Sequence, residues 1–494
     1  MIRRLIVFIL AVLTMFGTCC SVWAEDILID KDVLEKILQR QEALNKEVED
    51  LKRLMKEEDT TLPEHQLTED IEYLKEEVED MSDRLDVAET DSILDKIRLG
   101  GEFRTQVDFL RFDNIEVNGE KKDGNTDELW SGRFRINMRS EITDDIVFHG
   151  RLSYFKYWGD TNFEGSASDD RIFMKSDREG DIHVERAYVD YFVPGTPFAF
   201  TFGRYPTSDG PPYEFKNHTT RKSTWPQMFV NGEFDGIAGS LSLEEWTGLR
   251  ASMLRIGYSK VTQNYQQYQG LKIDPVRVGF FSVESEFPGV RDSLLWLGVH
   301  KLFDNFSLSF IPDTEYPEDS GTYETYTLHL QFDNIMKSGL GWFGVFCFQD
   351  IHPRSEGTEL APGYEVGFYG DSLQGDLGKR REGYAVYTGL KYILPIASLK
   401  NPHIGFEYNY GSKYWFPGSI YGSEPTNKLG VNGHAYELYY LQPIAGKHMF
   451  CRIGAAYQDF EYDPPFYIYG SREGEDAKTD KSILHSYFLI DVRF

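Results

Sequence analysis

Apolar and polar residues alternate along most of the chain after residue 97. In the segment 133–139, Phe134, Ile136 and Met138 fill one set of positions, and arginine or asparagine fills the other. Successive side chains of a β-strand point to opposite faces, so this segment has one apolar and one polar face. The pattern predicts strands through this part of the chain.

Similar runs recur up to the C-terminus and are divided by polar segments that contain Gly or Pro. The expected strands are 101–109, 133–139, 146–157, 182–193, 197–204, 234–243, 249–259, 276–286, 293–303, 305–311, 322–332, 340–349, 363–370, 383–393, 403–411, 434–441, 448–459 and 483–494. A soluble β-sandwich also alternates, but it rarely has so many strands in one unbroken domain. We therefore expect residues 99–494 to form an all-β transmembrane barrel of about 16–18 antiparallel strands.

The last seven residues, 488–494, are typical of a strand that closes such a barrel. Apolar side chains alternate with Asp491 and Arg493, and the chain stops on Phe494. Lipid would contact the apolar face, and an aqueous lumen would contact the polar face. We also expect Phe494 to be the residue through which the barrel-assembly machinery recognises the chain.

The other end of the chain predicts export. Two arginines precede the apolar run 5–16, and Ala24 is a small residue at an expected cleavage site, so residues 1–24 are expected to be a signal peptide. The run is shorter than the ~20 residues of a membrane span, which disfavours an uncleaved anchor. A lipoprotein signal at Cys19 and Cys20 is disfavoured by the preceding Thr18. The expected location is the outer membrane, with the N-terminal segment in the periplasm.

Residues 25–98 are expected to be a separate periplasmic coiled coil that is broken near Pro63. A solvated amphipathic helix is the alternative, but each apolar stripe is narrow and charged residues cover the rest. A homo-oligomer, either a dimer or a trimer, would follow. The heptad positions are Leu34, Ile37, Leu44, Val48, Leu51 and Met55, and then Leu67, Ile71, Leu74, Val78, Met81, Leu85 and Ala88.

Composition excludes several function classes. The formal net charge of −28 argues against a nucleic-acid partner. After cleavage only Cys347 and Cys451 would remain, which excludes a disulfide framework and a CxxC motif. The histidines are scattered, and no local catalytic set is present, so we expect no metal, no cofactor and no enzyme activity.

The polar faces of the early strands carry a ladder of arginines that would line the pore. An ion-pair mesh with inward acids such as Asp108, Glu141, Glu185 or Asp190 is one reading of this ladder. An electropositive stripe that guides anions through a narrow point is the other. The candidate pore-lining residues are Arg104, Arg133, Arg135, Arg139, Arg151, Arg186 and Arg204.

The longest turn-like stretches are the expected extracellular loops. They are 112–128, 159–181, 205–233, 371–382 and 417–432.

Four segments resemble an uncharacterised family of porin-like outer-membrane proteins of Gram-negative bacteria. They are 185–191, 203–212, 234–237 and 407–415. The resemblance covers most of 99–494, and it implies a channel by architecture without implying a substrate.

These observations lead to one functional hypothesis and two alternatives. The hypothesis is an outer-membrane porin that allows passive diffusion of small hydrophilic solutes or ions. The first alternative is a structural or scaffolding barrel that tethers periplasmic partners and has a plugged lumen. The second is a sheath for an electron-transfer cytochrome.

Overall fold

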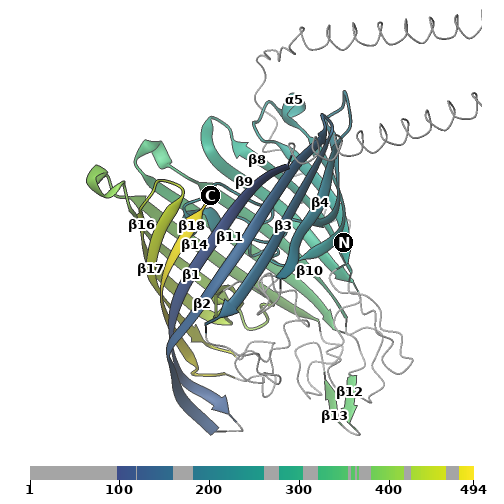
Figure 1. Cartoon of the computed structure of the whole chain (residues 1–494). Helices are drawn as coiled ribbons and strands as arrows, with labels where there is room; N and C mark the ends of the chain where they lie inside the picture. The colour runs from purple at the N-terminus through teal and green to yellow at the C-terminus, as the bar shows by residue number, and fades with distance from the viewer. Residues whose placement is uncertain are drawn as a thin grey trace, which may run out of the picture. The chain divides into compact units, whose positions relative to one another are not determined.

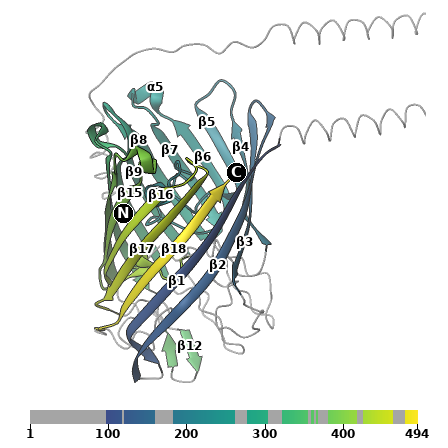
Figure 2. The same ribbon diagram turned by 60° about the vertical axis from the view of Figure 1, so that its left-hand side comes forward.

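Sixteen strands form one closed antiparallel barrel in the computed structural model (Figures 1 and 2). The structure describes residues 97–117, 120–158, 182–260, 277–303, 321–353, 358–361, 364–366, 380–416, 424–462 and 478–494. The predicted signal peptide and the predicted coiled coil, up to residue 96, lie outside these residues. The barrel confirms the all-β antiparallel prediction, and its strand number lies within the predicted range.

Each wall strand pairs with the wall strands that come before and after it in the sequence, and the first strand pairs with the last to close the barrel. The wall strands are β1 (Ile97–Val117), β2 (Glu120–Thr143), β3 (Ile146–Tyr157), β4 (Ile182–Phe192), β5 (Phe198–Tyr205), β6 (Phe234–Ser242), β7 (Met253–Lys260), β8 (Arg277–Phe287), β9 (Val290–Phe303), β10 (Gly321–Phe332), β11 (Leu340–Pro353), β14 (Arg381–Ile393), β15 (His403–Gly411), β16 (Gly433–Pro443), β17 (Met449–Phe460) and β18 (Ser482–Arg493). The short helices are α4 (Tyr213–Asn217), α5 (Glu244–Thr247), η1 (Ile335–Lys337), η2 (Ala397–Leu399) and η3 (Lys428–Gly430).

The C-terminal strand closes the barrel, as predicted. β18 pairs with β1, and Phe494 continues the ladder, since its amide donates to the Gly101 carbonyl at 3.0 Å and its carbonyl accepts from the Gly101 amide at 2.7 Å. A Cβ atom on Gly101 would lie 2.2 Å from the Phe494 ring. Glycine at this position therefore leaves room for the terminal ring to lie over β1.

Two sequence predictions for the wall are wrong. Residues 112–128 were expected to be a loop, but most of them extend β1 and β2. Their polar side chains on both faces hid the alternation, because a strand with water on both sides needs no apolar face. The expected strand 363–370 is also not part of the wall. Residues Tyr364–Val366 (β13) pair only with Thr358–Ala361 (β12) in a small separate hairpin. The expected strand 305–311 lies outside the described residues.

The two ends of the barrel have connections of different length. Two residues join β2 to β3, two join β8 to β9, and both termini of the barrel lie at this same end (Figure 2). The connections 206–233 and 412–432 leave the opposite end. The chain therefore enters and leaves the barrel at its short-turn end.

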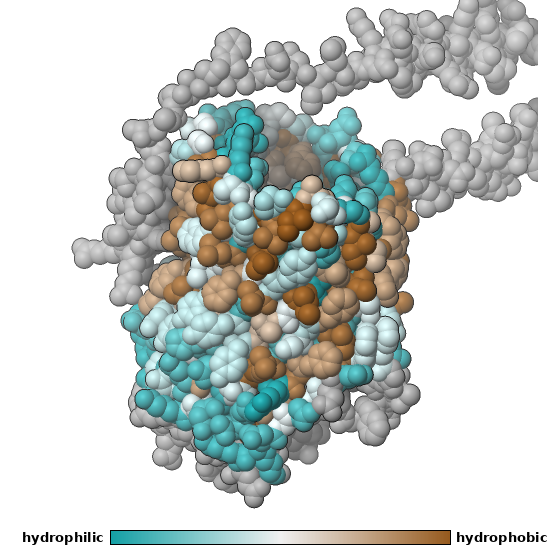
Figure 3. All heavy atoms as spheres, turned by 90° about the vertical axis from the view of Figure 1, so that its left-hand side faces the viewer, coloured by the Kyte–Doolittle hydropathy of each residue, from teal (hydrophilic) through white to brown (hydrophobic). Residues whose placement is uncertain are grey.

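The outer face of the wall is apolar. Phe134 of β2, Leu438 of β16 and Ile453 of β17 are exposed, and each alternates with buried or polar neighbours. Figure 3 shows brown side chains gathered across the middle of the wall and teal ones towards its ends. An apolar band between polar ends is the pattern of a barrel whose outer face contacts lipid.

Candidate functional site

The connection 206–233, between β5 and β6, folds into the lumen; we call it the inner loop. Arg452 of β17 donates from Nη1 to Asn217 Oδ1 at 3.0 Å, and Gln331 of β10 donates from Nε2 to Glu214 Oε1 at 2.6 Å. These partners come from widely separated strands of the wall, so the inner loop spans the lumen. The sequence predicted a loop here, but it placed that loop outside the barrel.

Aromatic side chains hold one part of the inner loop against the wall. The ring centroids of Trp225 and Phe280 lie 4.5 Å apart, and those of Phe229 and Trp296 lie 4.7 Å apart, both edge to face. Phe229 is buried, and Trp296 is fully buried. Full burial of one such side chain contributes about 1.5–3 kcal/mol, so these contacts strongly favour the inward position of the loop.

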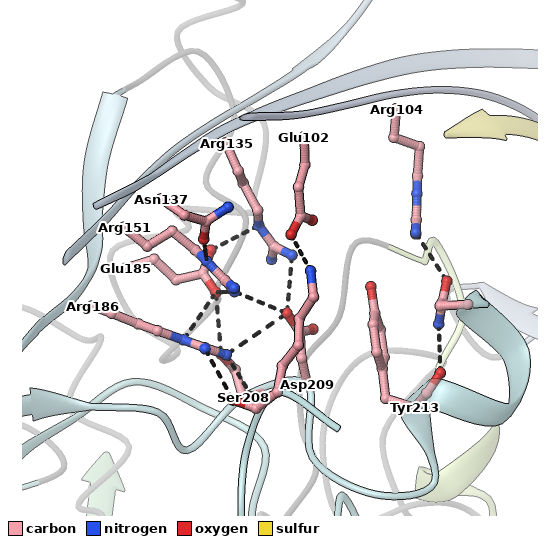
Figure 4. Close-up of polar contacts among 12 residues, drawn as sticks. Glu102, Arg104, Arg135, Asn137, Arg151, Glu185, Arg186, Ser208, Asp209 and Tyr213 are labelled. Atoms are coloured by element: carbon pink, nitrogen blue, oxygen red, sulfur yellow. Dashed lines mark hydrogen bonds and ion pairs between the residues drawn. The ribbon is translucent and has the colours of Figure 1, made fainter. Parts of the chain in front are cut away.

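Ion pairs hold another part of the inner loop against β2, β3 and β4 (Figure 4). Asp209 Oδ2 lies 3.0 Å from Arg135 Nη1 and 3.1 Å from Arg151 Nη1. Glu185 carboxylate oxygens lie 2.8 Å from Arg135 Nε and 3.0 Å from Arg151 Nη1. Arg186 Nη2 donates to the Ser208 carbonyl at 2.8 Å and lies 3.8 Å from Asp209. We call five of these residues the arginine network: Arg135, Arg151, Glu185, Arg186 and Asp209.

A β-bulge on β4 explains how two consecutive charged residues both face the lumen. The register between β3 and β4 shifts after Arg151, so that Arg186 and Val184 face consecutive residues of β3 and Glu185 is left over. An extra residue of this kind re-aims neighbouring side chains. Strict alternation would have placed Glu185 and Arg186 on opposite faces.

The arginine network fixes the charge of the loop carboxylate. Burial alone would raise the pKa of the Asp209 carboxyl, but Arg135, Arg151 and Arg186 outweigh burial and hold this pKa below its usual range. Asp209 therefore stays ionised and keeps its three partners at ordinary pH.

A second inward segment, residues 412–416 and 424–432, is joined to the inner loop through Glu437 of β16. Lys216 of the inner loop lies 2.8 Å from Glu437 Oε1, and Lys428 of the second segment also pairs with Glu437. Glu437 is almost fully buried. The two segments therefore support each other within the lumen.

The other predicted wall arginines lie in different surroundings. Arg104 pairs with Asp491 at 2.8 Å and also donates to Asn217, and Arg133 is buried opposite Arg104 in the ladder. Arg139 is half exposed and pairs with Glu141 at 3.1 Å.

Arg204 was predicted to line the pore, but it lies on the same face of β5 as the exposed Phe200 and Phe202, which is the outer face of the wall. It pairs with Asp235 at 2.9 Å and with Glu233 at 3.0 Å.

Of the four acids that were expected to pair with the arginines, two do so and two lie beside histidines instead. Glu185 pairs with network arginines and Glu141 pairs with Arg139, whereas Asp108 lies 2.7 Å from His485 and Asp190 lies 3.4 Å from His149. Asp209 was missed because its segment was expected to be outside. The apolar residues at 225 and 228–230 were the available signal, since so many large apolar side chains in one loop are seldom left in water.

Within the described ranges, no helix is long and apolar enough to cross a membrane.

The fold defines a closed barrel of antiparallel strands with an inward loop, and the family can now be stated. A family model described as a protein of unknown function (DUF3373) matches residues 123–467, which is more than half of the chain. The chain belongs to this family, which confirms the resemblance to an uncharacterised family. Comparison with curated proteins found no match.

Several solved barrels are similar at low identity. OmpF of Salmonella typhi, in complex with daunomycin, is 10% identical with a TM-score of 0.44, over 81% of this chain and 97% of that one. An anion-selective porin from Comamonas acidovorans is 12% identical with a TM-score of 0.43, over 81% and 99%. OmpT, an outer membrane protein of Vibrio cholerae, is 12% identical with a TM-score of 0.42, over 81% and 97%.

Proposed function

We propose that this protein is an outer-membrane barrel of the porin type that lets small hydrophilic solutes or ions diffuse through its lumen. Selection would depend on the space left beside the inner loop and on the charges of the wall. The observation that carries this proposal is the closed barrel with an apolar outer band, a charged inner face and a loop folded across the lumen. A water-filled, polar interior is what a porin-type barrel offers a solute.

The lengths of the connections support an orientation. Bacterial outer-membrane barrels have short periplasmic turns and longer extracellular loops. The short-turn end would therefore face the periplasm. Because β1 begins at this end, residues 25–96 would lie in the periplasm after cleavage of residues 1–24. A coiled coil there would join barrels into a dimer or trimer.

One observation favours the scaffolding alternative. Several inner-face side chains that contact the inner loop are fully buried, among them Trp296 of β9 and Phe343 of β11, and Arg135 is 1% exposed. A lumen filled in this way on every side would be a plug, and the barrel would act as an anchor for periplasmic partners. No described feature favours the cytochrome sheath.

Liposome swelling separates the two candidates. Vesicles that contain the purified full chain should swell in solutions of small sugars, at rates that fall steeply as the sugar grows. The double variant Trp225→Ala, Phe229→Ala should swell faster with the larger sugars, because it frees the apolar side of the inner loop. If the wild-type protein gives the swelling rate of empty vesicles with every sugar, the porin proposal is wrong and the scaffold is favoured.

A further inference from the structure

A lateral row of polar side chains crosses the inner face of β1 to β4 near the short-turn end. The strand register places Arg98 opposite Arg139, Arg139 opposite His149, and His149 opposite Tyr188. The His149 and Tyr188 rings are stacked, with centroids 4.7 Å apart. The next row towards the barrel centre contains Asn137, Arg151 and Arg186. The arginine network therefore has a basic row between itself and the mouth.

Arg98 and Arg139 are like charges placed directly opposite each other. Such a pair is destabilising unless something of opposite charge lies nearby. Arg139 has Glu141 as a partner at 3.1 Å, and His149 has Asp190 at 3.4 Å. Among the described residues, Arg98 makes no side-chain hydrogen bond or ion pair, and it is exposed. Within the described part of the chain, the row therefore keeps one guanidinium, that of Arg98, without a carboxylate partner.

A cavity lies over this row. Its volume is about 290 Å³, and its polar lining consists of Arg98, Asn137, Arg139, His149, Arg186 and Tyr188. A water molecule occupies ~30 Å³ of the liquid, so the cavity has room for about ten waters or for a small anion with part of its hydration shell. Three arginines, a histidine, an asparagine and a tyrosine therefore contribute to the lining of one space.

We propose that this cavity binds a small oxyanion through a phosphate or carboxylate group. A guanidinium presents donors in a planar fork that matches both groups, which makes arginine the usual residue for such recognition. Arg98 and Arg139 would hold the two sides of the anion, and Arg186 would form the floor, where its contact with Ser208 fixes its position. An anion between Arg98 and Arg139 would also remove the repulsion within the pair.

The site differs from the narrow part of the lumen. The site shares only Arg186 with the arginine network that clamps the inner loop; Arg98 and Arg139 lie nearer the short-turn mouth, and the other network residues, such as Asp209, do not line the cavity. Binding there does not require flow through the barrel, so the inference stands or fails separately from the porin proposal.

Binding of inorganic phosphate and of citrate to the full chain tests the proposal. The protein is purified in phospholipid-free detergent, and the heat of binding is measured by titration calorimetry at low salt. The wild-type protein should bind both anions, and Arg98→Gln and Arg139→Gln should each raise the dissociation constant at least about tenfold. Arg98→Lys should raise the dissociation constant less than Arg98→Gln does. Lysine keeps the positive charge and lacks only the planar pair of guanidinium donors.

Arg111→Gln is the matched control. Arg111 also lies on β1, but it is exposed at the opposite end, where it pairs with Asp113 at 3.0 Å. This variant should bind phosphate like the wild-type protein. Equal affinity in the wild-type protein and both glutamine variants would overturn the proposal, and so would an equal loss in Arg111→Gln, which would indicate a general charge effect.

A second arm identifies the source of the phosphate group. The protein is placed in nanodiscs made with either zwitterionic phospholipid or phosphatidic acid, and phosphate is titrated again. Unchanged binding in both discs indicates a dissolved anion. Loss of phosphate binding only with phosphatidic acid indicates that a lipid headgroup occupies the same site. Failure to bind phosphate or citrate in detergent and in both discs would reject the site.

Discussion

When Asp209 loses its charge, the part of the inner loop around it should detach from β2, β3 and β4, while the rest of the loop stays in place. Asp209→Asn keeps the shape of the side chain, but it leaves Arg135, Arg151 and Arg186 with Glu185 as their only carboxylate in the network. Breaking a buried ion pair by removing one partner costs about 3–5 kcal/mol. The sixteen-strand ladder is untouched, and Asn217 and the aromatic contacts still hold the rest of the loop. The cost should therefore appear as opening of residues 206–213.

Hydrogen exchange measures this opening directly. The amide of residue 209 donates to Asn231 Oδ1, and the Tyr213 amide donates to the Gly210 carbonyl, so the segment contains protected amides. A loss of about 3–5 kcal/mol corresponds to exchange that is about 150-fold to 5,000-fold faster for peptides within 206–213. Peptides of β16 to β18 should exchange at the wild-type rate. The variant should also still migrate differently in SDS gels before and after heating, as a folded barrel does.

Asp235→Asn is the control for this variant. Asp235 pairs with Arg204 beyond the other end of the loop, but it is more than half exposed. Exposed ion pairs contribute about 0–1 kcal/mol, so exchange in the control should change less than about fivefold. If Asp209→Asn also changes exchange in 206–213 by less than about fivefold, the arginine network does not hold the loop, and the reasoning is refuted.

The pH dependence of the same peptides follows from the direction of the pKa shift. Burial opposes ionisation of Asp209, but the arginines prevail and lower its pKa in the folded state. A lowered pKa gives a contribution that is fully present above the unfolded value of about 3.9 and is lost only as the pH falls through the lower folded value. After correction for intrinsic exchange, protection of 206–213 should therefore be constant between about pH 5 and pH 8.

Three further predictions concern the wall and the N-terminal segment. Phe134→Arg should lower the yield of heat-modifiable barrel, since a charge on the lipid face at mid-membrane costs about 2–4 kcal/mol, whereas Arg135→Gln should assemble normally; the reverse result would mean that the two faces are exchanged. Deletion of Phe494 should slow barrel assembly in a pulse-chase experiment, and wild-type kinetics would argue against recognition of the terminal residue. Residues 25–95 should be helical and self-associate in sedimentation experiments, and Leu44→Asp or Leu74→Asp should abolish association; a monomeric coil at high concentration would contradict the coiled coil.

The sequence predicted the wall because one physical requirement governs it. A strand between lipid and a polar interior must alternate, and the alternation placed Phe134 outside and Arg135 inside, as the structure shows. Where both faces of a strand lie in water, as in the ends of β1 and β2, that requirement disappears, and the prediction failed.

The interior was harder to predict than the wall. The arginines of β2 to β4 could be found from their spacing, but their partner Asp209 is brought to them only by the tertiary fold of the inner loop. The bulge that turns Glu185 and Arg186 to one face depends on pairing between strands. Neither the contacts of Asp209 nor the bulge on β4 can be predicted from a periodic pattern in the local sequence.

Single-channel recording from the purified full chain in a planar bilayer tests the central claim most directly. The porin account predicts discrete, long-lived conductance steps at neutral pH, which become larger when the aromatic contacts of the inner loop are removed by Trp225→Ala with Phe229→Ala. Correctly folded barrels that insert and give no steps, in the wild-type protein and in the double variant alike, would contradict the account and leave a closed scaffold in its place.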